Sequence, residues 1–251
     1  MLCGNASFGG VNVLITGISS GLGEGLAHAA LRAGANVWGI SRRPPDKSFS
    51  VYRERLRFLS ADLSDAENAS AAVENWVADV GKWDQVWLNA GILPPIADLR
   101  ATSLSILKAT FEVNVFANHW LLSLLEGRAQ IEQVVAISSG ASISGHRGWN
   151  AYGISKAALN MWVQSFAAEL PKTHFTALAP GLVDSEMQDY LTALAVDERY
   201  PTIERLKAAK GTEQMPDGVE VGLRLWDVAP KLVEQVASGS YVDIRKFADD
   251  S

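Results

Sequence analysis

Short apolar segments rich in β-branched residues alternate with longer segments of helical period along most of the chain. A parallel sheet requires this order, because each strand is followed by a crossover helix and helices cover both faces of the sheet. Seven segments have the composition of buried strands: 11–16, 36–40, 57–60, 85–88, 133–138, 175–179 and 240–244. The alternation therefore predicts an α/β protein with a parallel sheet at its centre.

Segments with helical period lie between these strands, at about 21–33, 65–79, 103–125 and 151–170. Ser64 precedes two acidic residues, and we expect it to cap the second of these helices. Residues 182–230 break the rhythm, because prolines interrupt them and no strand is evident. We expect this segment to be an insertion above the carboxyl ends of the strands, where open α/β sheets bind ligands. No repeat or linker divides residues 1–251, which are expected to form one domain.

The composition of the chain argues against several kinds of partner and site. The formal net charge of −6 and the pI of about 5.3 provide no basic surface for nucleic acid. The single cysteine, Cys3, cannot form an intramolecular disulfide, and the four histidines lack the paired spacing of a metal site. Neither a secretory signal nor a run of about 18 apolar residues is evident. We therefore expect a cytoplasmic protein that does not enter a membrane.

The first predicted strand leads directly into a glycine-rich turn, GISSGLG at residues 17–23, which opens a helical segment. Dinucleotide sites use this order, because glycines let the backbone approach the pyrophosphate while free N–H groups of the helix face the anion. The alternative is a turn that only packs a helix on a strand. The context favours a cofactor site formed by Gly17, Ser19, Ser20, Gly21, Leu22 and Gly23.

The string TGISSGLG resembles the cofactor loop of the short-chain dehydrogenase/reductase family. The resemblance spans nearly the whole chain and continues, in family order, through Asn89-Ala90-Gly91, Asn114, Ser139, Tyr152, Lys156 and Pro180-Gly181. It implies a single domain of Rossmann type, with a doubly wound, seven-stranded parallel sheet. It also implies a nicotinamide cofactor and an oxidoreductase that acts on carbonyl or alcohol groups.

The end of the second strand bears on the choice of cofactor. An acidic residue here would bind the ribose 2′-hydroxyl of NAD, but this chain has Ser41, Arg42 and Arg43. Guanidinium groups make charge-assisted contacts to phosphate, so these residues predict binding of NADP(H) through its 2′-phosphate. The alternative is that both arginines are solvated loop residues.

Tyr152 and Lys156 are four residues apart in a helical segment, which places them on one helix face. A nearby ammonium favours the phenolate, so we expect Lys156 to lower the pKa of Tyr152 and make it a proton donor to a carbonyl group. The alternative is a buried aromatic residue beside a surface lysine. The resemblance implies that Tyr152 and Lys156 also contact the cofactor.

Two further catalytic residues follow from the resemblance. Ser139 precedes Tyr152 by the family's interval, and its hydroxyl would bind the substrate oxygen as charge develops there. Ser138 is the rival, but alternation along a strand lets only one of the two face the substrate. Asn114 matches the asparagine that holds a water against the lysine, and its alternative is an asparagine satisfied within a helix.

The resemblance assigns the remaining cofactor contacts to three loops. Asp62 and Leu63 would lie beside the adenine, although Asp62 could instead be an ordinary helix-capping acid. Asn89, Ala90 and Gly91 would pack beside the adenine and support the sheet. The loop with Pro180, Gly181, Val183 and Ser185 would lie under the nicotinamide carboxamide.

The strings GWNAYGISKAA, APGLVDSEMQ and SGSYVDI resemble one branch of the family, sepiapterin reductase and bacterial reductases of vicinal diketones such as benzil. This implies NADPH-dependent reduction of a ketone or vicinal diketone. Asp243 would anchor the substrate, with Trp149, Met187 and Tyr190 closing over it. The alternative for Asp243 is an ordinary carboxylate at a strand end.

Other functions stay open at this stage. One is a short-chain alcohol dehydrogenase acting on another small substrate. Another is a non-catalytic NADP-binding regulator, although such a protein could lose the tyrosine, lysine or serine, and all three are present. An epimerase or dehydratase would usually need a longer C-terminal region. The resemblance also implies a homo-oligomer, a dimer or tetramer, formed through the helices that hold Asn114 and Tyr152.

Overall fold

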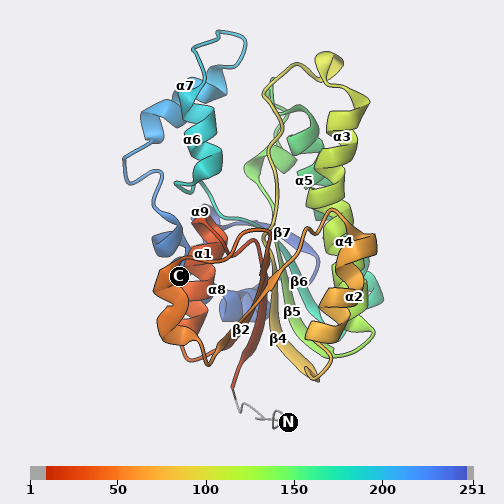
Figure 1. Ribbon diagram of the computed structural model, residues 1–251. Coiled ribbons are helices and arrows are strands. Elements are labelled where there is room, and N and C mark those ends of the chain that lie inside the picture. Colours follow the sequence, from red (N-terminus) through yellow and green to blue (C-terminus); the bar gives the residue numbers. More distant parts are fainter. Residues whose placement is uncertain (1–9, 248–251) are drawn as a thin grey trace.

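Seven parallel strands form one sheet in the order β3-β2-β1-β4-β5-β6-β7 (Figure 1). The computed structural model describes residues 10–247, and Cys3 lies outside them. The strands are β1 (Asn12–Thr16), β2 (Asn36–Ser41), β3 (Leu56–Ser60), β4 (Lys82–Leu88), β5 (Gln130–Ile137), β6 (His174–Ala179) and β7 (Ser240–Asp243). All seven predicted strands are confirmed. The strand order reverses between β1 and β4, which is where doubly wound sheets open a ligand crevice.

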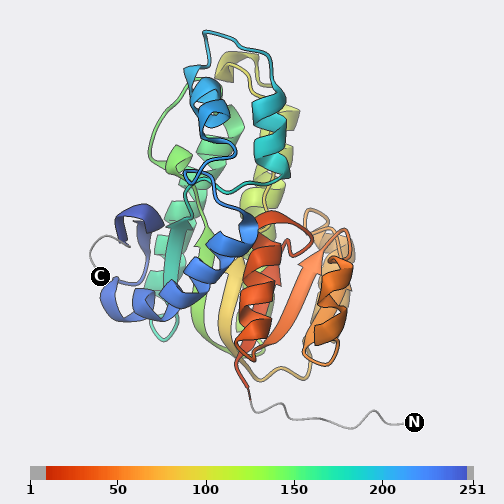
Figure 2. The ribbon, with the colours of Figure 1, turned by 90° about the vertical axis from the view of Figure 1, so that its left-hand side faces the viewer.

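Two layers of helices cover the sheet (Figures 1 and 2). One face carries α1 (Gly21–Arg32) and α8 (Gly218–Gln235), and the other carries α2 (Ala66–Trp76), α4 (Ala117–Glu126) and α5 (Asn150–Glu169). The shorter helices are α3 (Leu104–Phe111), α6 (Glu186–Ala193), α7 (Pro201–Ala209) and α9 (Ile244–Phe247). Short 3₁₀ turns cover Lys47–Tyr52, Leu99–Ala101 and Gly140–Ser142. No helix within residues 10–247 is long and apolar enough to cross a membrane.

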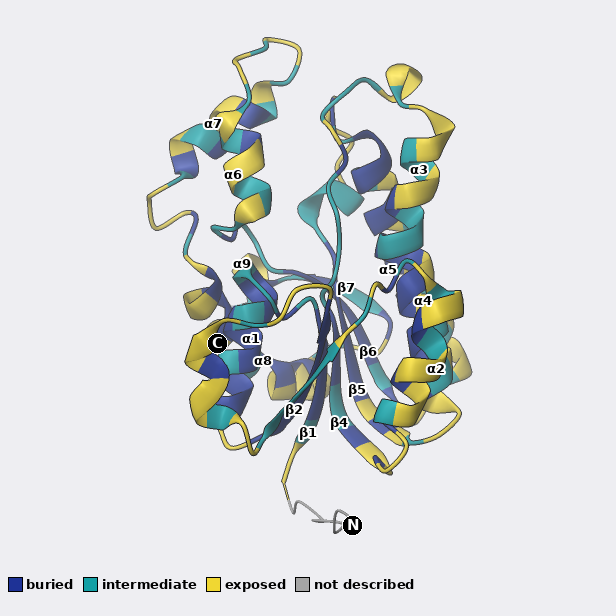
Figure 3. Ribbon diagram, viewed as in Figure 1, coloured by how far each residue is buried: buried dark blue, intermediate teal, exposed yellow. Residues whose placement is uncertain are grey.

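The strands separate two apolar cores, and buried residues dominate the sheet in Figure 3. Val13 and Ile15 of β1 pack into the core beneath α1 and α8, whereas Leu14 packs into the core beneath α2, α4 and α5. This alternation follows from the period of two in a strand, since neighbouring side chains point to opposite faces. Both faces of the sheet are therefore buried, as the apolar strand sequences predict.

Helices α1 and α8 approach each other closely because glycines line their contact. A Cβ atom built on Gly25 would lie 1.7 Å from the carbonyl oxygen of Gly218, and one built on Gly222 would lie 2.3 Å from the carbonyl carbon of Gly25. Only hydrogen fits at these positions. The last part of the expected insertion, 182–230, therefore belongs to a helix that packs on α1.

Pro230 lies inside α8 and does not end it. Buried apolar residues recur along the helix with helical period, at Val221, Leu225, Val228 and Leu232. Their packing against the sheet outweighs the loss of one helical hydrogen bond.

The part of the insertion that stands above the sheet comprises α6 and α7. These helices share a small core of their own, formed by Leu191, Ile203, Leu206, Ala209 and Met215.

The cap of α2 differs from the prediction. Asp65, not Ser64, is the N-cap residue, and its carboxylate accepts a hydrogen bond of 3.2 Å from the backbone N–H of Asn68. Ser64 instead donates its hydroxyl to Asp62. Both residue types favour N-caps, so sequence preference alone could not separate neighbours.

Candidate active site

The turn between β1 and α1 has the geometry that an anion-binding loop requires. Gly17 and Gly21 have φ angles of +75° and +59°, a region that favours glycine. A Cβ atom on Gly23 would lie 2.1 Å from the Gly17 carbonyl oxygen, so the helix can begin this close to the loop only with glycine. The N-cap residue Ser20 makes no capping hydrogen bond. The N–H groups at the start of α1 are therefore available to a pyrophosphate, and these residues fit a dinucleotide.

Asn89 and Ala90 hold this loop in place. The side-chain amide of Asn89 donates to the carbonyl oxygens of Thr16 and Gly17, at 2.9 and 3.3 Å. The Thr16 hydroxyl accepts from the backbone N–H groups of Asn89 and Ala90, both at 2.9 Å. The motif thus ties the end of β4 to the end of β1, next to the turn.

The side chains expected at the adenosine end lie along the same cleft. The carboxylate of Asp62 accepts from the N–H and the hydroxyl of Ser64, and these hydrogen bonds lower its pKa. Arg42 is exposed to the cleft. Arg43 donates to both carboxylate oxygens of Glu186, each at 2.8 Å. An ion pair therefore spans the cleft from the end of β2 to the start of α6.

The loop after β6 completes the expected cofactor site. Pro180, Gly181, Val183 and Ser185 all line the cleft, and a Cβ atom on Gly21 would lie 3.2 Å from Cβ of Ser185. Ser185 is the N-cap of α6 and makes no capping hydrogen bond. Its hydroxyl is therefore available next to the glycine-rich turn.

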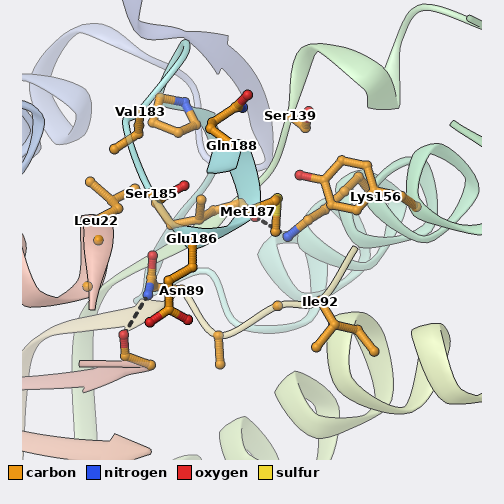
Figure 4. A pocket seen from close by; sticks show the side chains of 18 of the residues that line it. Leu22, Asn89, Ile92, Ser139, Lys156, Val183, Ser185, Glu186, Met187 and Gln188 are labelled. Atoms are coloured by element: carbon orange, nitrogen blue, oxygen red, sulfur yellow. Dashed lines mark hydrogen bonds between the residues drawn. The ribbon is translucent and has the colours of Figure 1, made fainter. Parts of the chain in front are cut away.

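Tyr152 and Lys156 lie on the inner face of α5, as their spacing predicts, and both are buried. Figure 4 shows Lys156 and Ser139 on one side of the cleft, opposite Leu22 and Val183. The ammonium nitrogen of Lys156 lies 5.9 Å from the centre of the Tyr152 ring. It donates a 2.7 Å hydrogen bond to the carbonyl oxygen of Ile137.

Burial controls the proton affinity of both groups. It lowers the pKa of Lys156 to about 8. It raises the pKa of Tyr152, and a hydrogen bond with Ser139 opposes this rise. The direction for Tyr152 differs from the lowering that we expected from Lys156, because desolvation of the phenolate is the largest effect. Tyr152 is thus held in its protonated form, which is the form that can donate a proton.

The two serines after β5 have different surroundings. Ser139 contacts Tyr152, whereas the hydroxyl of Ser138 donates to Asn160, with an oxygen–oxygen distance of 2.6 Å. Asn160 in turn donates to the Ser142 hydroxyl, which donates to the backbone carbonyl of Ser139 at 2.6 Å. The hydroxyl next to Tyr152 is therefore that of Ser139, and Asn160 supports the segment that carries it.

Asn114 lies in a π-helical turn, Glu112–Phe116, which interrupts the single helix expected over 103–125. Its side chain is fully buried, accepts from the N–H of Ile92 at 2.8 Å and donates to the hydroxyl of Ser155 at 2.9 Å. Ser155 donates to the carbonyl of Tyr152. A Cβ atom on Gly91 would lie 3.2 Å from Oδ1 of Asn114 and 3.4 Å from Nζ of Lys156. Asn114 therefore joins the loop after β4 to α5, the helix that holds Tyr152 and Lys156.

These residues surround one cleft of about 990 Å³. Trp149 and Met187 line it, and the Trp149 ring lies 6.0 Å from that of Tyr152. The structure does not bring Tyr190 or Asp243 to its walls. Tyr190 is exposed on α6, and the carboxylate of Asp243 accepts hydrogen bonds from Arg245. Arg245 lines the cleft instead.

Sequence reasoning missed Glu186, Asn160 and Arg245. Two of them had a usable signal. Asn160 follows Lys156 by four residues on a helix, so it must share the face of Lys156. Arg245 follows Asp243 by two residues at a strand end, where a basic neighbour can pair with a carboxylate. The contact between Glu186 and Arg43 joins residues 143 positions apart and had no local signal.

The chain matches the family model described as short chain dehydrogenase over residues 11–194. A benzil reductase ((S)-benzoin forming) of Saccharomyces cerevisiae is 33% identical over 192 residues, covering 70% of this chain and 73% of that protein. A benzil reductase ((S)-benzoin forming) of Bacillus subtilis is 30% identical over 247 residues, covering 93% of this chain and 98% of that protein. The crystal structure of the KRED1-Pglu enzyme is 27% identical, with a TM-score of 0.82, and covers 92% of this chain and 100% of that one.

These similarities agree with the site geometry. The family match extends from β1 to the end of α6, and so includes the glycine-rich turn, Ser139, Tyr152 and Lys156. The predicted fold, with its doubly wound parallel sheet, is confirmed. The chain belongs to the short-chain dehydrogenase/reductase family, oxidoreductases that use a nicotinamide cofactor to act on carbonyl or hydroxyl groups.

Proposed function

We propose that this protein is an NADPH-dependent carbonyl reductase that reduces a ketone or a vicinal diketone, with Tyr152 as the proton donor. One observation carries the proposal. Tyr152, Ser139 and Lys156 lie in the same cleft as the glycine-rich turn and two exposed arginines. A substrate carbonyl and a nicotinamide cofactor could therefore meet in one site.

Each catalytic side chain has a distinct task in this proposal. The reduced cofactor, when bound, supplies the hydride that the carbonyl carbon accepts. The hydroxyls of Ser139 and Tyr152 donate hydrogen bonds to the carbonyl oxygen, which gains negative charge during the transfer. Tyr152 then releases its proton to that oxygen, and the ammonium of Lys156 stabilises the phenolate that is left.

The preference for NADPH rests on Arg42 and Arg43. Both line the cleft at the end of β2, and no acidic residue follows that strand directly. A guanidinium group gains a strong partner only from the cofactor that carries a 2′-phosphate. Arg42→Ala should therefore narrow the preference for NADPH over NADH, measured as the ratio of kcat/KM for the two cofactors. Equal specificity constants in the unaltered protein would contradict this part of the proposal.

The substrate class rests on the walls of the cleft and on the relatives. Trp149 provides an aromatic surface next to Tyr152, and Met187 provides an apolar surface in the same cleft, which suits a flat substrate. The two benzil reductases described above are at least 30% identical to this chain. A vicinal diketone such as benzil is therefore the first substrate to test, and sepiapterin is the second.

The experiment mixes purified protein with NADPH and benzil and follows the absorbance of the reduced nicotinamide. We expect cofactor oxidation that depends on both protein and benzil, with benzoin as the product. Sepiapterin and NADH are tested in parallel. If NADPH is not consumed with either carbonyl compound, while a simple alcohol is oxidised with NADP⁺, the protein is an alcohol dehydrogenase instead.

We also propose that the protein forms a homo-oligomer through the outer faces of α4 and α5. Phe116, the residue before α4, is 50% exposed, and Ile154 and Met161 of α5 are 41% and 60% exposed; such apolar groups gather at interfaces. Sedimentation of the protein and of Met161→Glu tests this, since a charge in the interface should favour monomers. A cytoplasmic location stays a prediction.

A further inference from the structure

The last strand ends in a paired acid and base. Nε of Arg245 donates to Oδ1 of Asp243 at 2.9 Å, and a terminal guanidinium nitrogen donates to Oδ2 at 2.6 Å. The Asp243 side chain is only 9% exposed, whereas that of Arg245 is 60% exposed. The pair lowers the pKa of Asp243 and raises that of Arg245, so both stay charged. Asp243 therefore holds the Arg245 guanidinium in place, and both of its carboxylate oxygens are used in this contact and not available to a substrate amine.

Arg245 is the member of the pair that reaches the cleft. It lines the cleft, and its Cδ lies 3.3 Å from the position of a Cβ atom on Gly181, in the loop after β6. Two of its nitrogens face Asp243, and the second terminal nitrogen makes no hydrogen bond to any residue in the described range 10–247. One edge of the guanidinium is thus held by protein, and the edge formed by the two terminal nitrogens still has N–H groups available to a ligand.

A further arginine lines the same cleft as Arg245. Arg205 of α7 is exposed there. Among the described residues that line the cleft, the carboxylates are those of Asp62 and Glu186. Both are engaged, Asp62 by Ser64 beyond β3 and Glu186 by Arg43 beyond β2. Among the described residues, the cleft therefore has no unengaged carboxylate that would compete with a substrate anion for Arg245.

We propose that Arg245 binds a carboxylate of the substrate, and that the protein reduces keto acids in preference to neutral ketones. This inference rests on the proposed carbonyl reductase function and specifies its substrate class. A planar carboxylate matches the free edge of a guanidinium, and the bond to Asp243 orders that edge before the substrate arrives. A 2-oxo acid resembles a vicinal diketone in which the second carbonyl belongs to a carboxylate.

The carboxylate is bound and unchanged in the reaction. Hydride adds to the neighbouring keto carbon, the keto oxygen takes the proton of Tyr152, and a hydroxy acid leaves. The cofactor is oxidised by the same two electrons that the keto carbon gains. The spacing between keto and acid groups is set by the distance from Tyr152 to Arg245, so two spacings are tested below.

The experiment compares acids with their own methyl esters, which differ in charge and little in shape. Phenylglyoxylate and 4-oxo-4-phenylbutanoate, each with its ester, are reduced with NADPH by the unaltered protein, by Arg245→Gln and by Arg245→Lys. Lys246→Gln is the matched control, because it removes the neighbouring charge outside the cleft. Thermal unfolding verifies that each variant is folded.

We expect at least one acid to exceed its ester in kcat/KM by roughly tenfold or more, the range of a charge-assisted contact. Arg245→Gln should remove that advantage and leave the ester within about threefold, whereas Lys246→Gln should keep it. Arg245→Lys should keep part of it, because the charge stays while the fork is lost. Equal rates for both acids and their esters, or an equal loss on both in Arg245→Gln, would overturn the inference.

Binding provides a readout that does not need turnover. Calorimetric titration of phenylglyoxylate and 4-oxo-4-phenylbutanoate into the protein with NADP⁺ should show an affinity that Arg245→Gln reduces about tenfold or more. Failure of the two proposals can be told apart. If benzil and the esters are reduced without preference for the acids, the reductase function stands and this inference fails. If no carbonyl compound is reduced but the acids bind through Arg245, the reductase function fails.

Discussion

The ion pair between Arg43 and Glu186 should compete with the cofactor for the same guanidinium. Arg43 donates to both oxygens of Glu186, and the two side chains are 62% and 64% exposed. A pair this exposed contributes about 0.2–1 kcal/mol. If Arg43 binds the 2′-phosphate of NADPH, that pair must open first. Glu186→Gln should therefore tighten NADPH binding by roughly 1.4- to 5-fold, the same energy expressed as a ratio.

The assay is a fluorescence titration of NADPH and of NADH into the unaltered protein, Glu186→Gln and Arg43→Gln. NADH lacks the 2′-phosphate, so its Kd should not change in Glu186→Gln. Arg43→Gln should weaken NADPH and leave NADH unchanged. If Glu186→Gln tightens both cofactors equally, or weakens NADPH, the competition does not exist and the pair only closes the cleft.

Three further predictions concern stability and catalysis. Gly25→Ala should lower the free energy of unfolding, measured by urea titration, by about 1–3 kcal/mol or more, because the new Cβ atom would overlap Gly218. Gly81→Ala is the control: no atom lies within 4 Å of its Cβ position, so the free energy of unfolding should change by less than about 0.5 kcal/mol. Asn160→Ala should reduce kcat roughly tenfold and leave the Kd of NADPH unchanged, because Asn160 supports the segment that carries Ser139. An equal effect on kcat and on the Kd would indicate general damage to the fold instead. The pKa of Lys156 is about 10.5 in the unfolded chain and about 8 in the folded protein. Between pH 8 and pH 10.5 the unfolded chain therefore binds more protons than the folded protein, so the free energy of unfolding rises with pH across this range. Relative to Lys156→Met, the unaltered protein should therefore gain up to about 3 kcal/mol of unfolding free energy as the pH rises across this range. If the difference between the two proteins does not change with pH, the lowered pKa of Lys156 is contradicted.

The strands could be predicted because burial on both faces leaves a strong local record. Each predicted strand is found, and the differences lie at the ends, as at Lys82 of β4. The helices were harder where tertiary contacts override local preference. Pro230 suggests a break, yet Gly218 and Gly222 let α8 pack so closely on α1 that the helix continues through it. The π-turn around Asn114 left no sequence signal, because its residues have ordinary helical preferences.

The site divides in the same way. The positions of residues that form or contact the glycine-rich turn, such as Gly17, Gly23 and Asn89, could be predicted from local sequence motifs. The pairings of Arg43 with Glu186 and of Asp243 with Arg245 depend on which side chains meet in space. A carboxylate at a strand end suggests an anchor for a positive substrate group. Arg245, two residues later, pairs with this carboxylate and lines the cleft, so the cleft presents a positive charge where Asp243 alone predicts a negative one.

The most direct measurement of the central claim is the turnover of Tyr152→Phe with NADPH and benzil, together with its Kd for NADPH. This change removes only the hydroxyl that contacts Ser139, and the buried ring stays in place. A positioned acid contributes roughly 10²- to 10⁴-fold, so kcat should fall by at least that range while the Kd of NADPH changes less than about threefold. A kcat within about tenfold of that of the unaltered protein would contradict the assignment of Tyr152 as the proton donor.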